Sequence, residues 1–91
     1  MIVTAEISCY PLTTDYSRVV DEFIRALRNY SDLKVQTSHS STLVIGEMDS
    51  LLSALQSCMT ESFTKNGKSS FVMKILSGDL TKTVDLSPYA D

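Results

Sequence analysis

Apolar residues recur along this chain at two different periods, and the order in which these periods follow one another restricts the possible folds. Near the N-terminus the period is two, and the apolar residues there are Val3, Ala5, Ile7 and Cys9. This alternation predicts a β-strand with two unlike faces over about residues 2 to 10. Pro11 is expected to end the strand, because proline has no N–H group to donate to a neighbouring strand.

The next segment has the period of an α-helix. Its apolar residues, at spacings of three and one, are Tyr16, Val19, Val20, Phe23, Ile24, Leu27 and Tyr30. They form one stripe on a helix that is expected to end near Asn29. Thr14 or Asp15 can cap its N-terminus, because a side-chain oxygen there can accept a hydrogen bond from a free backbone N–H group.

A second helix is predicted after Asp49, which is another suitable N-cap residue. Its apolar stripe, expected to be buried, consists of Leu51, Leu52, Leu55, Met59 and Phe63. The helix is expected to end at Asn66 or Gly67, since either residue can adopt the left-handed conformation that often follows a helix.

Three further segments are predicted to be strands. Residues 33 to 38 and 42 to 46 flank a short polar turn as a hairpin, and residues 70 to 77 form the last strand. The order strand, helix, strand, strand, helix, strand predicts an α+β sandwich of the ferredoxin-like type, a four-stranded antiparallel sheet with both helices on one face. One domain is expected over residues 1 to 80, followed by a polar tail over residues 81 to 91.

The composition is that of an ordinary globular domain and argues against several classes of function. The net charge is −3, and the eight Lys and Arg residues are scattered, whereas a nucleic-acid-binding surface normally has a basic patch. No apolar stretch approaches the ~20 residues needed to cross a bilayer, and the N-terminus lacks the basic region of a signal peptide. We therefore expect a cytoplasmic protein without membrane insertion, in which Cys9 and Cys58 are reduced.

Nothing in the pattern of reactive residues predicts an enzyme. His39 is the only histidine, and it has no Ser or Cys partner at a recognisable spacing. The three glycines are isolated, so the sequence has no phosphate-binding loop, and it has no cluster of metal ligands. We expect no cofactor.

Two helices can cover only one face of the predicted sheet. The side chains expected beneath the helices are Val3, Ala5, Ile7, Cys9, Leu43, Ile45, Phe71, Met73 and Ile75. Those expected on the open face are Thr4, Glu6, Ser8, Tyr10, Thr42, Val44, Val72, Lys74 and Leu76. This second set is too apolar for a simple solvated surface, and contiguous exposed apolar area usually marks an interface or a ligand site. A second subunit is therefore expected to pack its sheet against the open face.

Glu6 is the most informative residue of the open face, because a carboxylate in the middle of a central strand is costly to desolvate unless it is paired. One interpretation is a cross-strand pair with Lys74, which has the matching parity on the neighbouring strand. The other is that the Glu6 carboxylate meets a cationic or amine-bearing ligand. The pattern leaves both interpretations open.

Four hydroxyl-bearing residues form a second candidate group: Ser8, Tyr10, Ser41 and Thr42. Serine and threonine at a hairpin often bond the local backbone and shape the turn. However, Ser8 and Thr42 are expected on the same face of adjacent strands, with Tyr10 beyond them. Hydroxyl groups that converge beside an aromatic ring suit a small, flat, polar heterocycle. Spacing alone does not choose between the two interpretations.

Three stretches of the sequence resemble a known family: AEISCYPLTTDYSRVVDEFI, SSTLVIGE and FVMKILSGDL. Over roughly residues 2 to 80 the chain resembles the YkoF-like family of thiamine- and hydroxymethylpyrimidine-binding proteins. The resemblance implies a protein that binds thiamine or its hydroxymethylpyrimidine moiety without catalysis, in vitamin salvage or transport. It also implies a homodimer or a dimer of dimers, because members of the family pack their sheets together.

The ligand contacts that the resemblance implies at matching positions are Ser8, Tyr10, Ser41 and Thr42. Gly78 and Asp79 match the family's last-strand ending, where the backbone can approach a ligand closely. Glu6 and Lys74 are added to the candidate ligand-binding residues on physical grounds, not from the resemblance.

Two alternatives belong to other classes of protein. In the first, the open face serves self-association alone, in an interaction or regulatory module without a small-molecule ligand. In the second, the order of elements reflects a hydrolase of the acylphosphatase type. Such an enzyme needs an anion-binding arginine in the loop after the first strand, and here Arg18 falls inside the predicted helix.

Overall fold

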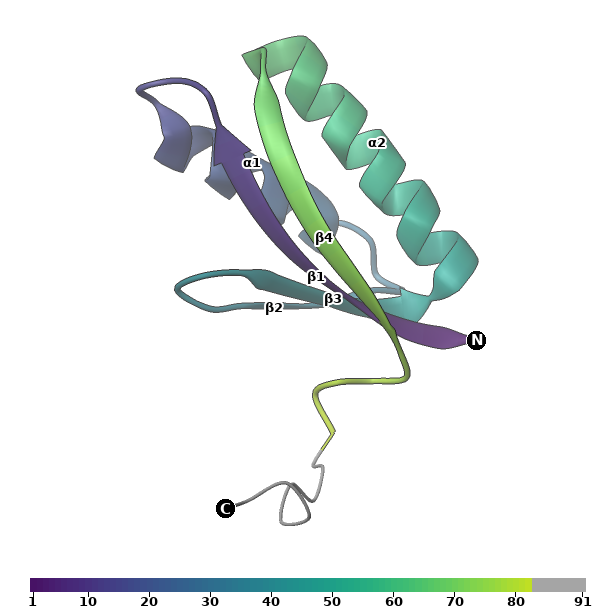
Figure 1. The fold of residues 1–91 in the computed structure, drawn as a ribbon. Coiled ribbons are helices and arrows are strands. Elements are labelled where there is room, and N and C mark those ends of the chain that lie inside the picture. Colours follow the sequence, from purple (N-terminus) through teal and green to yellow (C-terminus); the bar gives the residue numbers. More distant parts are fainter. Residues whose placement is uncertain (83–91) are drawn as a thin grey trace, which may run out of the picture.

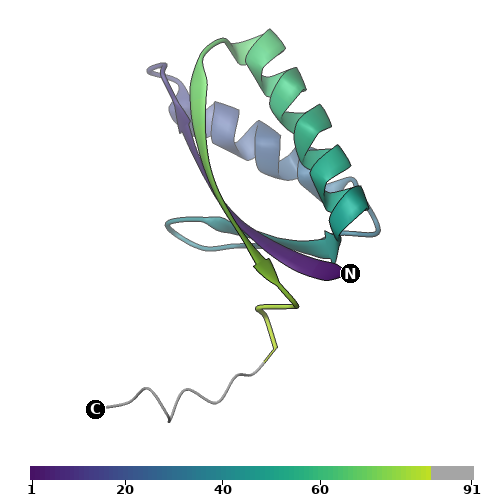
Figure 2. The same ribbon diagram turned by 45° about the vertical axis from the view of Figure 1, so that its right-hand side comes forward.

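The computed structural model describes residues 1–82, and residues 83–91 of the predicted polar tail lie outside this range. The elements are β1 (Ile2–Pro11), α1 (Tyr16–Arg28), β2 (Lys34–Thr37), β3 (Thr42–Glu47), α2 (Met48–Asn66) and β4 (Ser69–Ser77). The strands form one antiparallel sheet in the order β2-β3-β1-β4, and both helices lie on the same side of it (Figures 1 and 2). The predicted ferredoxin-like fold is therefore confirmed.

β1 pairs with its two neighbours over different lengths. Its ladder with β3 stops at Ile7, opposite Thr42, whereas its ladder with β4 continues to Pro11, opposite Ser69. The backbone N–H of Leu12 donates to Lys68 on the β4 side, so the nitrogen of Pro11 faces the other side, where β3 has already ended. The strand therefore includes Pro11, one residue beyond the predicted end, without losing a hydrogen bond.

The hydrophobic core lies between the sheet and the two helices. Its residues, each less than a tenth exposed, are Val3, Ala5, Ile7, Phe23, Leu27, Leu33, Val44, Leu51, Ala54, Leu55 and Cys58. Burial of one Leu or Phe side chain stabilises a fold by about 1.5–3 kcal/mol, so this cluster supplies most of the packing energy. Phe71 of β4 extends the core toward the end of the helix layer, where its ring centroid lies 4.7 Å from that of Phe23.

The predicted orientation of β3 is wrong. The register places Val44 opposite Ala5 and Thr42 opposite Ile7, so both Val44 and Thr42 face the helices. Their neighbours on β3, Leu43 and Ile45, lie on the other face instead. Residues 43 to 45 are all apolar, so their pattern carries no period of two, and a shift of one residue exchanges the two faces of a strand.

The helices bury narrower stripes than predicted. In α1 the fully buried side chains are Val19, Phe23 and Leu27, and in α2 they are Leu51, Ala54, Leu55, Cys58 and Ser62. Leu52 and Phe63 lie beside the buried stripe of α2 and are exposed, contrary to the prediction. α2 also begins at Met48, directly after β3, so Asp49 lies in its first turn and does not cap it.

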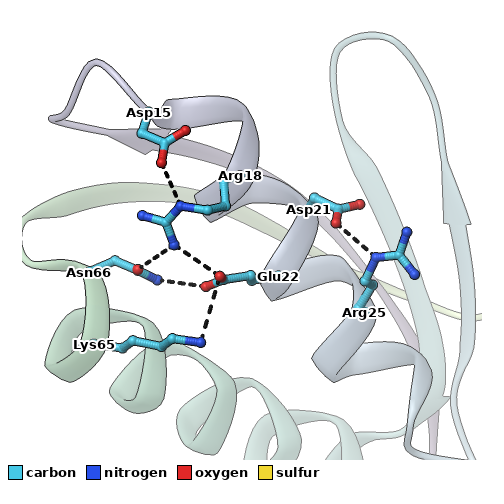
Figure 3. A network of polar contacts seen from close by, with 7 residues as sticks. All are labelled: Asp15, Arg18, Asp21, Glu22, Arg25, Lys65 and Asn66. Carbon is cyan, nitrogen blue, oxygen red and sulfur yellow. Dashed lines mark hydrogen bonds and ion pairs between the residues drawn. The ribbon is translucent and has the colours of Figure 1, made fainter.

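A polar network joins α1 to the end of α2 (Figure 3). Glu22 accepts hydrogen bonds from Arg18 at 2.9 Å and from Asn66 at 3.1 Å, and its carboxylate lies 3.6 Å from the ammonium group of Lys65. The hydrogen bonds from Asn66 and Arg18 lower the pKa of Glu22, and the charge of Lys65 adds to the effect. The network therefore binds the ionised form of Glu22.

The chain after β4 folds back across the face of the sheet that the helices leave uncovered. Residues 78–82, here called the strap, begin where Gly78 N–H donates to the backbone oxygen of Ile2. The buried hydroxyl of Thr4 donates to the backbone oxygen of Gly78 at 2.8 Å and accepts from the N–H of Leu80 at 2.9 Å. Lys34 of β2 donates to the Thr81 hydroxyl at 2.8 Å, so the strap reaches from β4 across β1 and β3 to β2.

The strap explains why two residues on the uncovered face are buried. Thr4 is fully buried although it lies on the uncovered face, and Ile45, its partner in the β1–β3 ladder, is only 5 % exposed. Both residues lie on the path of the strap between β4 and Lys34. The strap therefore forms a small second packing layer at one end of the sheet.

We expect Thr4→Val to destabilise the protein by about 1–3 kcal/mol, because the substitution leaves the oxygen of Gly78 and the N–H of Leu80 without their partner. Chemical denaturation measures this change, and Thr64→Val, at an exposed position of α2, is the matched control. Equal unfolding midpoints for Thr4→Val and wild type would show that the strap does not depend on this hydroxyl.

We also expect Glu22→Gln to remove a pH-dependent part of the stability. Because the folded-state pKa of Glu22 is lowered, its contribution is present above the ordinary glutamate pKa and is lost as the pH falls through the folded-state value. The free energies of unfolding of wild type and Glu22→Gln should therefore differ most near neutral pH and converge in acid. Glu61→Gln, at an exposed glutamate of α2, is the control, and a pH-independent difference for Glu22→Gln would contradict the expectation.

Candidate functional site

A cleft of about 490 Å³ opens at the end of the sheet where β1 extends past β3. One wall is the last part of β1, residues 7 to 10, and another is the hairpin loop between β2 and β3, residues 38 to 42. The third wall is a row of side chains on α1, namely Tyr16, Val20, Phe23 and Ile24. The cleft therefore combines an apolar helix wall with polar groups from two strands and a loop.

The hairpin loop is held by its own serine residues. The backbone oxygen of Ser41 accepts hydrogen bonds from the N–H of Ser38 at 2.9 Å and from the Ser38 hydroxyl at 3.1 Å. On the β1 side, the Ser8 hydroxyl donates to the backbone oxygen of Ser40 at 3.3 Å. These bonds fix the loop against β1, so the polar wall of the cleft is formed before any ligand binds.

Thr42 is the most enclosed polar residue of the cleft. The residue is only 7 % exposed, and its hydroxyl makes no hydrogen bond with another residue of the range 1–82. The fully buried side-chain oxygens without a partner in this range are those of Ser62 and Ser69, so the Thr42 oxygen keeps some access from the cleft. A hydrogen bond between it and a ligand would contribute about 1 kcal/mol net, which makes Thr42 a candidate contact point.

The four hydroxyl-bearing candidates Ser8, Tyr10, Ser41 and Thr42 all line the cleft. The prediction that they share one face of the sheet is wrong, because Thr42 faces the helices, whereas Ser8 and Tyr10 have the parity of the uncovered face. They still meet because the cleft lies at the end of the sheet, where groups from both faces reach the same space.

Glu6 and Lys74 form the predicted cross-strand pair. They are opposite one another in the β1–β4 ladder, and the Lys74 ammonium lies 3.4 Å from a carboxylate oxygen of Glu6. The other carboxylate oxygen accepts a hydrogen bond from the Ser41 hydroxyl at 3.3 Å. Glu6 does not line the cleft itself, but Ser41 connects its carboxylate to the rim. An exposed pair of this kind contributes at most about 1 kcal/mol to stability.

Gly78 and Asp79 lie at the opposite end of the sheet and belong to the strap. Ser77 is opposite Val3, five residues along β1 from Ser8, which corresponds to about 17 Å at ~3.3 Å per residue. Hydrogen bonds from the hydroxyl and the N–H of Thr81 lower the pKa of Asp79. The structure therefore gives Gly78 and Asp79 a role in shaping the strap and does not bring them to the cleft.

Sequence reasoning missed the α1 wall and His39, which also lines the cleft. The signal for the wall was present, because Tyr16, Val20 and Ile24 recur every four residues beside the buried row of α1. Val20 and Ile24 are half-buried although they lie outside the core. An apolar stripe on α1 that is wider than its buried row is thus the sequence feature that indicates this wall.

No strong nucleophile or metal site accompanies the cleft. Burial raises the pKa of the Cys9 thiol, which lines the cleft, so this thiol is protonated and weakly reactive near neutral pH. In residues 1–82, no three His, Cys, Asp or Glu side chains are grouped as metal ligands would be. No helix in this range has the length and apolar character needed to cross a membrane.

A second hollow, of about 260 Å³, lies between α1 and α2 and is lined in part by Glu22, Lys65 and Asn66. Glu22 and Lys65 contact one another in the network of Figure 3, and the Ser62 hydroxyl in this hollow is fully buried without a partner in the range 1–82. The larger cleft is the better candidate for a ligand site, since it combines an apolar wall with polar groups from two strands and a loop.

The sequence profile described as "thiamine-binding protein" matches residues 5–83. The chain belongs to the thiamine-binding protein family. The match spans β1 to the strap, so it includes every residue that lines the cleft. Membership in this family supports a thiamine-related role.

Solved structures confirm the fold of this thiamine-binding family member. A hypothetical protein from Methanocaldococcus jannaschii is 26 % identical, with a TM-score of 0.75 and coverage of 91 % of this chain and 87 % of the other. A protein from Streptococcus pneumoniae is 21 % identical, with a TM-score of 0.79 and coverage of 88 % and 90 %. A protein from Thermotoga maritima, provisionally assigned to thiamine biosynthesis or salvage, is 19 % identical, with a TM-score of 0.75 and 82 % coverage of both chains. Comparison with curated protein sequences finds no match.

Proposed function

We propose that this protein binds thiamine, or the hydroxymethylpyrimidine moiety of thiamine, in the cleft at the end of β1, without catalysing a reaction. The observation that supports this most strongly is the position of Thr42, a nearly buried residue that lines a cleft with an apolar wall and whose hydroxyl has no partner within residues 1–82. Family membership supports the choice of ligand. The proposed role is salvage or transport of the vitamin in the cytoplasm.

The chemistry of the cleft suits an aminopyrimidine ring. Such a ring is flat, with nitrogen acceptors and an exocyclic amino group that donates hydrogen bonds. The half-buried side chains of Val20 and Ile24 offer an apolar surface for its face, while the hydroxyls of Thr42 and Ser8 can exchange hydrogen bonds with its edge. Each neutral hydrogen bond contributes about 1 kcal/mol net.

The absence of a strong nucleophile agrees with binding as the function. The Cys9 thiol has a raised pKa, and His39 belongs to an exposed loop in which the Ser38 hydroxyl bonds the backbone and the Ser41 hydroxyl bonds Glu6. Binding alone is therefore what the arrangement supports best.

Thr42→Val tests the proposed site. The substitution keeps the shape of the side chain and removes the hydroxyl, so we expect the affinity for thiamine and for hydroxymethylpyrimidine to fall about fivefold, the equivalent of one neutral hydrogen bond. Stability should be unchanged or slightly higher, because the hydroxyl has no partner to lose within residues 1–82.

Isothermal titration with each compound measures this effect, and Thr64→Val on the exposed side of α2 is the matched control. Equal affinity of wild type and Thr42→Val would remove Thr42 from the site. No saturable binding of either compound to wild type would overturn the proposed function and favour the self-association alternative.

We further propose that the protein forms a homodimer or a dimer of dimers through the uncovered face of the sheet. Val72 and Leu76 on this face are 59 % and 37 % exposed, and they flank the Glu6–Lys74 pair. Exposed apolar side chains around a polar pair suit a sheet-to-sheet contact.

For this contact, light scattering should give a mass of two or four chains for wild type. Val72→Glu should reduce that mass toward one chain, because it places a carboxylate where the sheets would meet. Gln56→Glu, at an exposed position of α2, is the control for added negative charge. A wild-type mass of one chain at micromolar concentration would exclude the proposed assembly.

A further inference from the structure

The cleft contains no lysine or arginine. All eight Lys and Arg residues of the chain lie within the described range 1–82, and none of them lines the cleft. The sequence of residues 83–91 contains no basic residue and includes two aspartates. Besides these eight, the chain can carry a positive charge at the N-terminal ammonium, which binds Glu47, and at His39 on the wall of the cleft.

Three of the eight are held by carboxylates on the helices. Arg18 and Lys65 both contact Glu22, and Arg25 contacts Asp21 at 2.8 Å (Figure 3). Because these side chains interact with one another on α1 and at the end of α2, their charges are largely neutralised outside the cleft.

The remaining five lie elsewhere. Lys74 is paired with Glu6, Lys34 donates to Thr81 of the strap, and Arg28 donates to Thr37 of β2 at 3.4 Å. Lys68 lines a shallow hollow with Leu12 and Phe63, and Lys82 ends the strap.

The end of α1 at the cleft does not supply a positive site either. α1 begins at Tyr16, and a free helix N-terminus can bind an anion. Here, however, the N-cap residue is Asp15, and Arg18 binds its carboxylate, so the two side chains form an ion pair without net charge at that end. At the rim, the Ser41 hydroxyl bonds the carboxylate of Glu6, which is paired with Lys74, so this group adds no net positive charge either.

A phosphate group in this cleft would lose hydration without gaining a charged partner. Transfer of an ionised group away from water is costly unless a cation or several hydrogen-bond donors replace the water. The net charge of −3 adds a general repulsion of anions. A neutral ligand avoids both costs, and a cation avoids the repulsion.

We infer that the cleft selects unphosphorylated ligands, the thiazolium cation of thiamine or the neutral hydroxymethyl pyrimidine, and discriminates against their phosphate esters. This inference rests on the proposed function, because it concerns the same cleft. It assigns the protein to the stage at which the vitamin is free, before a kinase-type reaction adds phosphate or after a phosphatase-type reaction removes it.

Isothermal titration with thiamine, thiamine monophosphate and thiamine diphosphate, at pH 7.5 and constant ionic strength, tests the inference. We expect the monophosphate to bind at least tenfold more weakly than thiamine and the diphosphate to bind more weakly still. If the monophosphate binds less than tenfold more weakly than thiamine, the inference is overturned, but the proposed function stands because thiamine still binds. If thiamine itself does not bind, both fail.

His39→Lys tests whether charge is the cause, since His39 is exposed and lines the cleft. The added cation should reduce the ratio of the affinity for thiamine to the affinity for thiamine monophosphate at least threefold. Ser40→Lys is a second variant of the same loop. Gln56→Lys, on the exposed side of α2, carries the same added charge away from the cleft and should leave the ratio unchanged. An equal ratio in wild type and in both loop variants would show that charge does not set the selectivity, and would overturn the inference.

Discussion

The unequal pairing of β1 is the constraint on which the rest of the structure depends. β1 is hydrogen-bonded to β4 as far as Pro11 but to β3 only as far as Ile7. Its last residues therefore have a neighbour on one side and an open edge on the other. The loop after Thr37 and the outer row of α1 close around this edge, and the space that they enclose is the cleft.

Local periodicity was sufficient to predict the fold. The alternation of strand and helix periods gave the order of the six elements, and the parity of Glu6 and Lys74 gave their pairing in the β1–β4 ladder. It failed in β3, because Leu43, Val44 and Ile45 are all apolar and do not reveal which of them faces the helices. The facing was set instead by the register with β1, a non-local property that no short segment encodes.

The candidate site was only partly predictable for a related reason. The four hydroxyl-bearing residues line one cleft, but Gly78 and Asp79 do not, because the antiparallel direction of β4 carries them to the far end of β1. The α1 wall could have been found from the width of its apolar stripe. The hydrogen bonds of Thr4 to the strap could not, since they join residues more than seventy positions apart in the chain.

The strap also limits how another sheet can approach. It occupies one end of the uncovered face, over Thr4 and Ile45, and leaves Val72 and the Glu6–Lys74 pair free at the other. The strap would clash with a flat partner surface at this end of the sheet. A second sheet would therefore have to pack further along the strands, toward the end of β1 that carries the cleft. A partner displaced in this way would sit beside the rim at Ser41, and occupancy of the cleft and assembly of the chains would become physically coupled.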